Sequence, residues 1–431
     1  MEKLFAYIKI SIILFLTSCN FFSGEKTDNG IPNVALHGKY TLENAPLIGE
    51  FEGIEIFEGG ISGITYIPGT DMEFYLINDR GPNLVMTEHH LADGQNVKVF
   101  PFVDYAPKIF RAKLKDGRFF ITETLPIKNP EGKPVSGLPF PGNLDMNREI
   151  AWSDLNATQA GEDIWGIDAE GIVIGNDNDF WIVEEYRTSI MHLDKNGQIK
   201  TVYGPEIIND YYLPIDTVFK YRRPNRGFES VAITPSGLVY AMLQSPMWNP
   251  GPEISEASKL VRILELNPET GKTRMFLYEH SDTIDDVRVR DWKIADMVAV
   301  NDYEFLIIEH ATRNESQFMD VYKIDISNAT AIEAEFIEGN TPEQLINAET
   351  AAIYGINVVE RTHLFDMISA GYDPFLDKPE GITIIDELTI ALINDNDYDI
   401  DAPERNERVV SPGMPTCLYI FKLSQKLNFK R

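Results

Sequence analysis

Residues 168–187, DAEGIVIGNDNDFWIVEEYR, contain the pattern that decides the fold. An acidic residue and a glycine precede a short apolar run, a turn rich in Asn and Asp follows, and a second apolar run ends on carboxylates. Two such runs joined by turn residues are typical of a β-hairpin. We call this pattern the hairpin motif, and it predicts two strands with a carboxylate near each end of the unit.

The hairpin motif occurs five times in the chain. The other copies are ISGITYIPGTDMEFYLINDRG from Ile61, GFESVAITPSGLVYAMLQSP from Gly227, IADMVAVNDYEFLIIEH from Ile294 and KPEGITIIDELTIALINDND from Lys378. Their alignment defines a first register at Ser62, Glu170, Glu229, Asp296 and Glu380, and a second register at Asp79, Glu185, Gln244, Glu309 and Asp395. The two registers are 17, 15, 15, 13 and 15 residues apart, so the turn is the part that varies in length. A unit that recurs at intervals of tens of residues predicts a repeat architecture.

A second strand–turn–strand segment follows four of the copies, beginning at Ile109, Ser189, Lys259 and Asp320. The hairpin motif and this segment together supply four strands, which make one blade of a β-propeller. We therefore predict an all-β fold, a β-propeller of five to six four-stranded blades with loop and short helical insertions, in a single domain over residues 33–431. The last strand is expected at CLYIFKL from Cys417, with an N-terminal strand closing its blade.

Three stretches interrupt the repeat and are predicted to be insertions. They are a loop rich in Pro, Gly and Asn at 126–161, an aromatic and arginine-containing segment at 207–226, and a segment at 341–367. The last has helical spacing with Thr341 as its N-cap and Pro342 in the first turn, so we expect one or two helices there.

The composition describes a large globular protein with no nucleic-acid partner. The chain has 431 residues, of which 43% are hydrophobic and 11% aromatic, enough for an extensive core. Its formal net charge is −29, whereas binding to a phosphate backbone requires a basic surface. Such acidity serves solubility and also suits a protein that binds divalent cations. We expect a monomer.

The N-terminus, MEKLFAYIKISIILFLTSC, predicts export and lipid attachment. Its apolar run at 10–16 is too short to span a bilayer and follows two lysines, as in a signal peptide. The sequence Leu-Thr-Ser-Cys resembles the bacterial lipobox, which implies a lipoprotein signal peptide at 1–18 and lipidation of Cys19. Residues 19–32 would form a flexible tether, and the protein would be held on a membrane of the bacterial cell envelope, at the outer membrane. The alternative is an ordinary signal peptide with a chance cysteine.

In a closed array of hairpins, equivalent positions of the hairpin motif come together around the centre. Crowded carboxylates repel one another unless a cation lies among them, and calcium accepts six to eight oxygen ligands. We therefore predict a Ca²⁺ site. Its expected ligands are Asp79, Glu170, Glu185, Glu229, Glu309, Glu380 and Asp395. The alternative is that these carboxylates pair with arginine or backbone N–H groups within the fold.

The copies of the hairpin motif also carry a resemblance to a known family. SGITY with FYLINDRGPN, DAEGI with FWIVEEY, NRGFESVAITPSG with LQSPM, and KPEGI with LINDND occur in the order that the family shows. The chain from about residue 60 onward resembles the phytase-like family, described as esterase-like activity of phytase. This resemblance implies a β-propeller, phosphoester hydrolysis and dependence on calcium. With such a cation we expect a metal-activated water as the nucleophile and a small phosphorylated or ester substrate.

For that chemistry, we nominate four catalytic residues. Glu185 lies at the end of the clearest copy, Arg80 and Arg187 follow second-register carboxylates, and His310 adjoins Glu309. Guanidinium groups suit phosphate, and histidine suits proton transfer. Ion pairing of the arginines and packing of the histidine are the alternatives. A Gly-x-Ser-x-Gly elbow, a Walker A loop and an HExxH motif are absent from the sequence. Two other functions stay open: a propeller that binds a ligand or protein without catalysis, and a metal-dependent lactonase or carboxylesterase.

Overall fold

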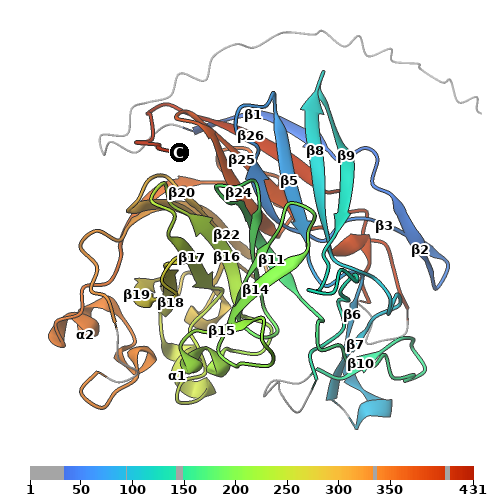
Figure 1. Cartoon of the computed structure of the whole chain (residues 1–431), viewed down its shortest axis with the longest axis horizontal. Coiled ribbons are helices and arrows are strands. Elements are labelled where there is room, and N and C mark those ends of the chain that lie inside the picture. The colour runs from blue at the N-terminus through green and yellow to red at the C-terminus, as the bar shows by residue number, and fades with distance from the viewer. Residues whose placement is uncertain (1–33, 94, 142–148, 333–336, 403–407) are drawn as a thin grey trace, which may run out of the picture.

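The computed structural model describes residues 34–93, 95–141, 149–332, 337–402 and 408–431 (Figure 1). The predicted signal peptide at 1–18, the lipidation site Cys19 and the tether at 19–32 lie outside these residues. None of the helices in the described part of the chain is long and apolar enough to cross a membrane.

Five sheets, each with at least four strands, make up most of the described chain. The first contains β4 (Ile61–Tyr66), β5 (Glu73–Asn78), β8 (Lys108–Lys115) and β9 (Arg118–Pro126). The second contains β11 (Ala169–Ile174), β12 (Phe180–Glu184), β13 (Ser189–Leu193), β14 (Ile199–Gly204) and β15 (Tyr212–Pro214). The third contains β16 (Phe228–Ile233), β17 (Val239–Leu243), β18 (Leu260–Leu266) and β19 (Thr273–Glu279). The fourth contains β20 (Lys293–Ala299), β21 (Glu304–Arg313), β22 (Ser316–Asp325) and β23 (Glu360–Asp366).

The fifth sheet joins the two ends of the described chain. It contains β24 (Pro379–Asp386), β25 (Thr389–Asn394), β26 (Cys417–Leu423) and the N-terminal strand β1 (Val34–Thr41). β1 runs antiparallel to β26 from the pair Val34–Leu423 to the pair Thr41–Cys417, and the two lie side by side in Figure 1. The predicted pairing of an N-terminal strand with CLYIFKL is therefore confirmed. The edge that β26 would otherwise expose is covered.

The hairpin motif forms the first two strands of each of these five sheets, and the five first strands contact one another in a cycle. β4 contacts β11 and β24, β16 contacts β11 and β20, and β20 contacts β24. The glycine of the hairpin motif allows these contacts, because a Cβ on Gly63 would lie 3.1 Å from the Cα of Gly171. A Cβ on Gly381 would likewise lie 3.2 Å from the backbone nitrogen of Ile64. The recurrent glycine is therefore a packing requirement between sheets.

The insertions add short elements around the five sheets. Two small sheets pair β2 (Leu47–Phe51) with β3 (Ile54–Phe57), and β7 (Gln95–Val99) with β6 (Leu84–His89) and β10 (Ala151–Trp152). The helices are α1 (Pro252–Ala257), α2 (Ala348–Ile353), η1 (His90–Ala92), η2 (Thr217–Tyr221), η3 (Val289–Asp291), η4 (Pro342–Leu345) and η5 (Asp397–Asp399). Thr341 caps η4, as expected, with its side chain and that of Gln344 forming a capping box. The helical prediction was wrong beyond Tyr354, because 360–366 supplies the fourth strand of its sheet.

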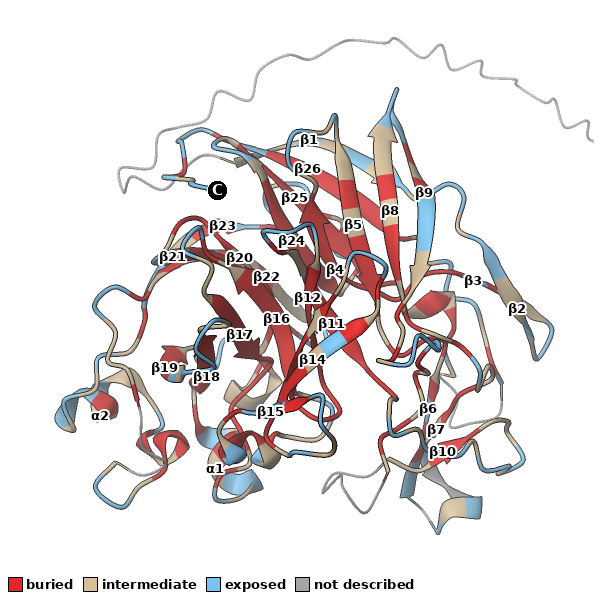
Figure 2. Cartoon of the chain, in the orientation of Figure 1, coloured by how far each residue is buried: buried red, intermediate tan, exposed pale blue. Residues whose placement is uncertain are grey.

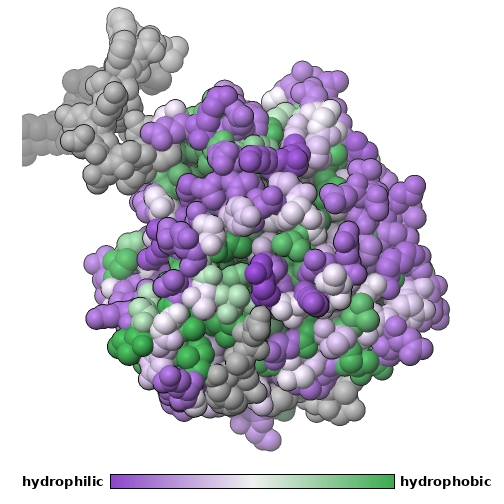
Figure 3. Space-filling view, turned by 60° about the vertical axis from the view of Figure 1, so that its left-hand side comes forward, coloured by the Kyte–Doolittle hydropathy of each residue, from purple (hydrophilic) through white to green (hydrophobic). Residues whose placement is uncertain are grey.

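Apolar side chains fill the spaces between the sheets. The strands nearest the centre are mostly buried, whereas outer strands such as β9 are partly exposed (Figure 2). Phe74, Phe110, Phe180 and Phe228 are among the largest fully buried side chains. Hydrophilic residues cover much of the face shown in Figure 3, with hydrophobic residues interspersed. Several carboxylates are nevertheless buried, among them Glu343, which pairs with the fully buried Arg262 at 2.7 Å, and those described in the next section.

His280, directly after β19, makes folding stability depend on pH. Its ring is buried, Nδ1 donates to the carbonyl oxygen of Ser281 at 2.7 Å, and Nε2 has no hydrogen-bond partner among the described residues. Burial lowers its pKa from the ordinary value of 6.5 to about 4, although the hydrogen bond to Ser281 opposes the shift; the nearby charges of Arg361 and Lys259 act in the same direction as burial. Between pH 6.5 and pH 4 the His280 ring is therefore protonated in the unfolded chain but mostly neutral in the folded chain. The free energy of unfolding falls as the pH falls through this range.

Because of His280, we expect the free energy of unfolding to be about 3 kcal/mol lower at pH 4 than at pH 7. Urea unfolding of the protein and of His280→Gln at both pH values measures the loss. The loss should be smaller in the variant by most of that amount, and equal losses would contradict the assignment to His280.

Candidate functional site

A β-bulge in the first strand of four sheets turns one side chain of each toward a common cavity. The strand register shifts between Ile61 and Gly63, Ala169 and Gly171, Phe228 and Ser230, and Pro379 and Gly381. The residues that the shifts leave unpaired are Ser62, Glu170, Glu229 and Glu380. All four line one cavity of about 150 Å³, which we call the acidic cavity. Bulges commonly re-aim a side chain in this way.

The second register of the hairpin motif reaches the same cavity. Asp79, Glu185, Gln244 and Asp395 each follow the second strand of their sheet and line the acidic cavity. Their backbone N–H groups donate to the carbonyl oxygens two residues before the bulge, at 2.9 to 3.0 Å. Because this backbone pairing is the same in all four sheets, it places equivalent side chains at equivalent points. Eight of the ten register positions therefore converge.

The fourth sheet departs from the predicted alignment. In it, Lys293 pairs with His310 and Ile294 with Glu309, so the position equivalent to Asp79 is His310. The corresponding first-register residue is Ala295, which restores a separation of 15 residues between the registers. The sequence alignment placed Glu309 at the second register because it assumed that the strand ends there. In the structure β21 continues to Arg313, four residues beyond Glu309. A carboxylate therefore does not mark the end of this strand.

Asp296 and Glu309 serve the fold outside the acidic cavity. Asp296 accepts hydrogen bonds from the backbone N–H groups of Ile382 and Met297, both at 2.8 Å. Glu309 accepts from the Tyr278 hydroxyl at 2.7 Å and from the Ser281 backbone at 2.8 Å, and it pairs with Arg361 at 3.3 Å. The structure therefore does not bring Glu309 together with the other predicted metal ligands.

The acidic cavity concentrates negative charge away from water. One carboxylate oxygen from each of Glu170, Glu229 and Glu380 lies within 4.8 Å of the others, and the same holds for Asp168, Glu170 and Glu185. Burial, and then repulsion by neighbouring carboxylates, raises the pKa of Glu170 and of Glu229 well above the usual value. Burial also raises the pKa of Glu380. These groups would ionise together only with a compensating positive charge.

Two further carboxylates follow the same trend. Burial and the charge of Asp395 raise the pKa of Asp79 to about 7. Burial raises the pKa of Asp395 to about 8, although the charge of Lys378 opposes the shift. Lys378 pairs with Asp395 at 3.0 Å and with Asp397 at 2.5 Å. The rim of the acidic cavity near the fifth sheet is thus partly neutralised by the protein itself.

The donors of the acidic cavity fit a hard divalent cation. They are carboxylate oxygens with hydroxyl and amide oxygens from Ser62 and Gln244, and Ca²⁺ prefers an all-oxygen set of this kind. Oε2 of Glu229 and Oε1 of Gln244 are buried and have no hydrogen-bond partner among the described residues. Buried oxygens without partners are costly unless something binds to them. The residues present can therefore hold a metal ion.

Arg80 is enclosed by carboxylates. It pairs with Asp168, with Glu149 at 2.8 Å and with Glu185 at 3.5 Å, and its guanidinium stacks on the Tyr186 ring. Its side chain is 4% exposed. Every side of this predicted phosphate ligand is therefore occupied within the fold.

Lys98 and Glu149 extend the same network of ion pairs, and the sequence pattern did not predict them as site residues. They pair at 2.9 Å, and Lys98 and Arg80 both donate to the Asn225 side chain. Although burial alone would raise it, the charges of Lys98 and Arg80 lower the pKa of Glu149 to about 2. Both residues come from the insertions and not from the hairpin motif, so no repeat could reveal them.

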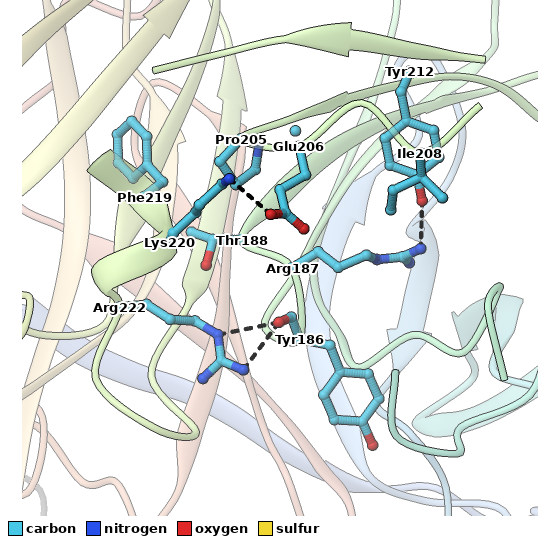
Figure 4. A pocket seen from close by; sticks show the side chains of 11 residues that line it. Tyr186, Arg187, Thr188, Pro205, Glu206, Ile208, Tyr212, Phe219, Lys220 and Arg222 are labelled. Carbon is cyan, nitrogen blue, oxygen red and sulfur yellow. Dashed lines mark hydrogen bonds and ion pairs between the residues drawn. The ribbon is translucent and has the colours of Figure 1, made fainter. Parts of the chain in front are cut away.

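Arg187 lies in a different pocket, between the second sheet and η2 (Figure 4). Its guanidinium donates to the Tyr212 hydroxyl at 2.6 Å and to the backbone oxygens of Gly166 and Ile164 at 3.1 and 3.2 Å. It also stacks on Phe140. The structure therefore does not place Arg187 beside Glu185 in the acidic cavity.

A third register of the hairpin motif also contributes to the site and was overlooked. Two residues before each bulge stand Gly60, Asp168, Gly227, Lys293 and Lys378. Asp168 holds Arg80, whereas Lys293 and Lys378 line the acidic cavity. Asp168 and Lys378 could be seen at this position in the sequence alignment, whereas Lys293 falls there only once the structure moves the first register of the fourth sheet to Ala295.

Comparisons with known proteins agree with the repeated motif. The family model described as "Phytase-like: Esterase-like activity of phytase" matches residues 57–398. An "Uncharacterized secreted protein" of Arthroderma benhamiae is 26% identical over 201 residues, an alignment that covers 38% of this chain and 38% of that protein. The chain thus spans about two-fifths of the length of the curated relative it matches.

Solved structures match at low sequence identity. A protein of unknown function from Dyadobacter fermentans is 10% identical with a TM-score of 0.37, over 91% of this chain and 100% of that one. A glycoside hydrolase of the GH130 family that targets β-1,2-mannosidic linkages is 8% identical with a TM-score of 0.41, over 92% of this chain and 95% of that one. The family match alone therefore bears on the site.

Proposed function

The chain belongs to the phytase-like family, and from this membership and the acidic cavity we propose that it hydrolyses phosphoester bonds with the help of a bound calcium ion. The observation that carries the proposal is the convergence of Glu170, Glu229 and Glu380 on one buried point. Three carboxylates in such proximity can all be ionised only with a cation among them, and that cation would attract the phosphate of a substrate that the carboxylates alone would repel.

The proposed scaffold is a five-bladed β-propeller whose blades are the five sheets. The cycle of contacts among β4, β11, β16, β20 and β24 supports this architecture. The pairing of β1 with β26 supports it as well, because a strand from each end of the chain completes the same blade. In this arrangement the acidic cavity lies at one end of the central channel.

The proposed cation ligands are Glu170, Glu229 and Glu380, with Asp79, Glu185 and Asp395 at the same cavity. A calcium ion bound there would neutralise phosphate charge and lower the pKa of a coordinated water. Glu309, the seventh predicted ligand, is excluded by its bonds to Tyr278 and Ser281.

Glu185 is the residue that we propose to accept a proton during hydrolysis. It lines the acidic cavity, its Oε1 accepts from the Gly227 backbone at 3.3 Å and its Oε2 faces Arg80 at 3.5 Å. These contacts fix the carboxylate while leaving it at the cavity wall. A Cβ on Gly227 would lie 2.6 Å from the Glu185 backbone, so the glycine is needed for Glu185 to occupy this place.

The protein is proposed to act in the cell envelope as a monomer, tethered through a lipid on Cys19. The lipobox-like sequence supports this location, as does the partial similarity to a protein that is described as secreted.

A lactonase or carboxylesterase on the same scaffold is the second candidate. The observation in its favour is that Arg80, the arginine that lines the acidic cavity, is already enclosed by carboxylates. A neutral ester would need a cation to polarise its carbonyl but no arginine to hold a phosphate.

Metal analysis and a substrate panel test both candidates on the purified full chain. We expect bound calcium, release of phosphate from phytate or from simple phosphomonoesters, and loss of this activity with a chelator that is reversed by added Ca²⁺. Hydrolysis of lactones or carboxylic esters alone would establish the second candidate. Calcium binding without any hydrolysis would indicate a propeller that binds ligands without catalysis, and it would refute the proposed activity.

A further inference from the structure

The fourth sheet breaks the acidic pattern of the cavity. The first, second, third and fifth sheets each have a carboxylate at one or both register positions. The fourth sheet, which contains β20 and β21, has Ala295 and His310 at these positions. At the third register it brings Lys293, which lines the acidic cavity. One edge of the cavity, at the start of β20, is therefore basic.

Lys293 differs from the other cations that line the acidic cavity, because those are paired. Lys378 pairs with Asp395 at 3.0 Å, Lys98 with Glu149 at 2.9 Å, and Arg80 with Glu149 at 2.8 Å. Lys293 makes no ion pair and no side-chain hydrogen bond with any residue that the structure describes.

Arg226 lies next to Lys293 and, among the residues that the structure describes, also has no counter-ion. Its guanidinium donates to the backbone oxygen of Trp292 at 3.0 Å, which fixes it beside the first residue of β20. It forms no ion pair within the described residues. His310, the cross-strand partner of Lys293, has no side-chain hydrogen bond in the same part of the chain. Two cations thus lie at this edge, Lys293 in the cavity wall and Arg226 beside it, and neither forms an ion pair with a carboxylate of the described residues.

Burial and neighbouring positive charges disfavour the cationic forms of both groups at this edge. Burial, and then the charges of Arg226 and Lys378, lower the pKa of Lys293, although the charges of Glu380 and Glu229 oppose the shift. Burial, and then the charge of Arg223, lower the pKa of Arg226 to about 10. Positive groups that disfavour one another's charge would be stabilised by a negative group placed between them.

We propose that Lys293 and Arg226 bind the phosphoryl group of the substrate at the β20 edge of the acidic cavity. This inference rests on the proposed function and names the residues that recognise its substrate. A phosphoryl group carries several acceptor oxygens, so it can bond to a lysine and an arginine while also facing a cation held by the carboxylates. The cavity volume of about 150 Å³ suits a phosphoryl group whose organic part extends toward the rim.

Binding of inorganic phosphate to the purified full chain tests this inference by isothermal titration, with calcium present. The variants are Lys293→Met and Arg226→Met, with Lys200→Met as a control that removes one charge from an exposed strand position outside the cavity. We expect each cavity variant to bind phosphate about 10-fold more weakly or worse, and the control to bind within about 2-fold of the unchanged protein. Lys293→Arg should restore most of the affinity and so exclude a folding defect.

Calcium binding, measured separately without phosphate, should persist in Lys293→Met. Unchanged phosphate affinity in both cavity variants would overturn the inference even if phosphoesters are hydrolysed. Loss of phosphate binding in both variants would support it even if no hydrolysis is found, in which case only the proposed activity fails. Acetate that competes as strongly as phosphate would overturn the assignment to a phosphoryl group.

Discussion

Replacing Glu170 by glutamine is expected to weaken calcium binding by about 10- to 100-fold or more and to reduce phosphate release in parallel. Glu170 belongs to both groups of carboxylates that could hold a cation, so its loss affects either arrangement. Without calcium, the variant should unfold at a temperature equal to or above that of the unchanged protein. Removing one of several carboxylates that repel one another lowers the electrostatic repulsion in the folded, calcium-free protein. A residue needed for function can therefore reduce stability.

Glu309→Gln is the matched control, because the hairpin motif nominated both glutamates and the structure separates them. Calcium at 100 times its Kd should stabilise the unchanged protein and Glu309→Gln by about 2.7 kcal/mol, and Glu170→Gln by much less at the same concentration. Thermal unfolding with and without calcium measures both. A full calcium response in Glu170→Gln would show that calcium binds somewhere other than among these carboxylates.

Replacing Arg80 by methionine is expected to lower the free energy of unfolding by about 3–5 kcal/mol. The change leaves Asp168, which is fully buried, without its positive partner, and it removes one partner each from Glu149 and Glu185. A carboxylate that cannot reach water must then either remain charged and unpaired or take up a proton. Urea unfolding at neutral pH measures the loss.

Arg111→Met provides the comparison for Arg80. Arg111 pairs with Glu73 at 2.6 Å, but its side chain is 36% exposed, so its loss should cost about 1 kcal/mol or less. If Arg80→Met were as stable as Arg111→Met but lost phosphate binding, Arg80 would be a substrate ligand, as the sequence first indicated. The ion pairs that the Arg80 guanidinium already makes with Asp168, Glu149 and Glu185 favour a role in stabilising the fold.

The acidic cavity shows how far a repeated pattern can predict a site. Glu170, Glu229 and Glu380 could be found from the hairpin motif because each copy repeats the same bulge, and the bulge fixes where a side chain points. Glu309 was misplaced because a strand end cannot be read from a carboxylate when the strand continues. The spacing of 13 residues in that copy, against 15 in three others, was the available warning.

The sequence by itself determined the strands of the hairpin motif, their fivefold repetition and the carboxylates that they share, because alternation of apolar runs and turns is a local property of the chain. Only the tertiary structure decided which charges meet. Arg80 pairs with Asp168, Arg187 donates to Tyr212, and Lys293 lines the acidic cavity with no ion-pair partner in the described part of the chain. Such pairings depend on contacts between residues far apart in the chain, and the energy of each charge depends on its burial, which no local pattern records.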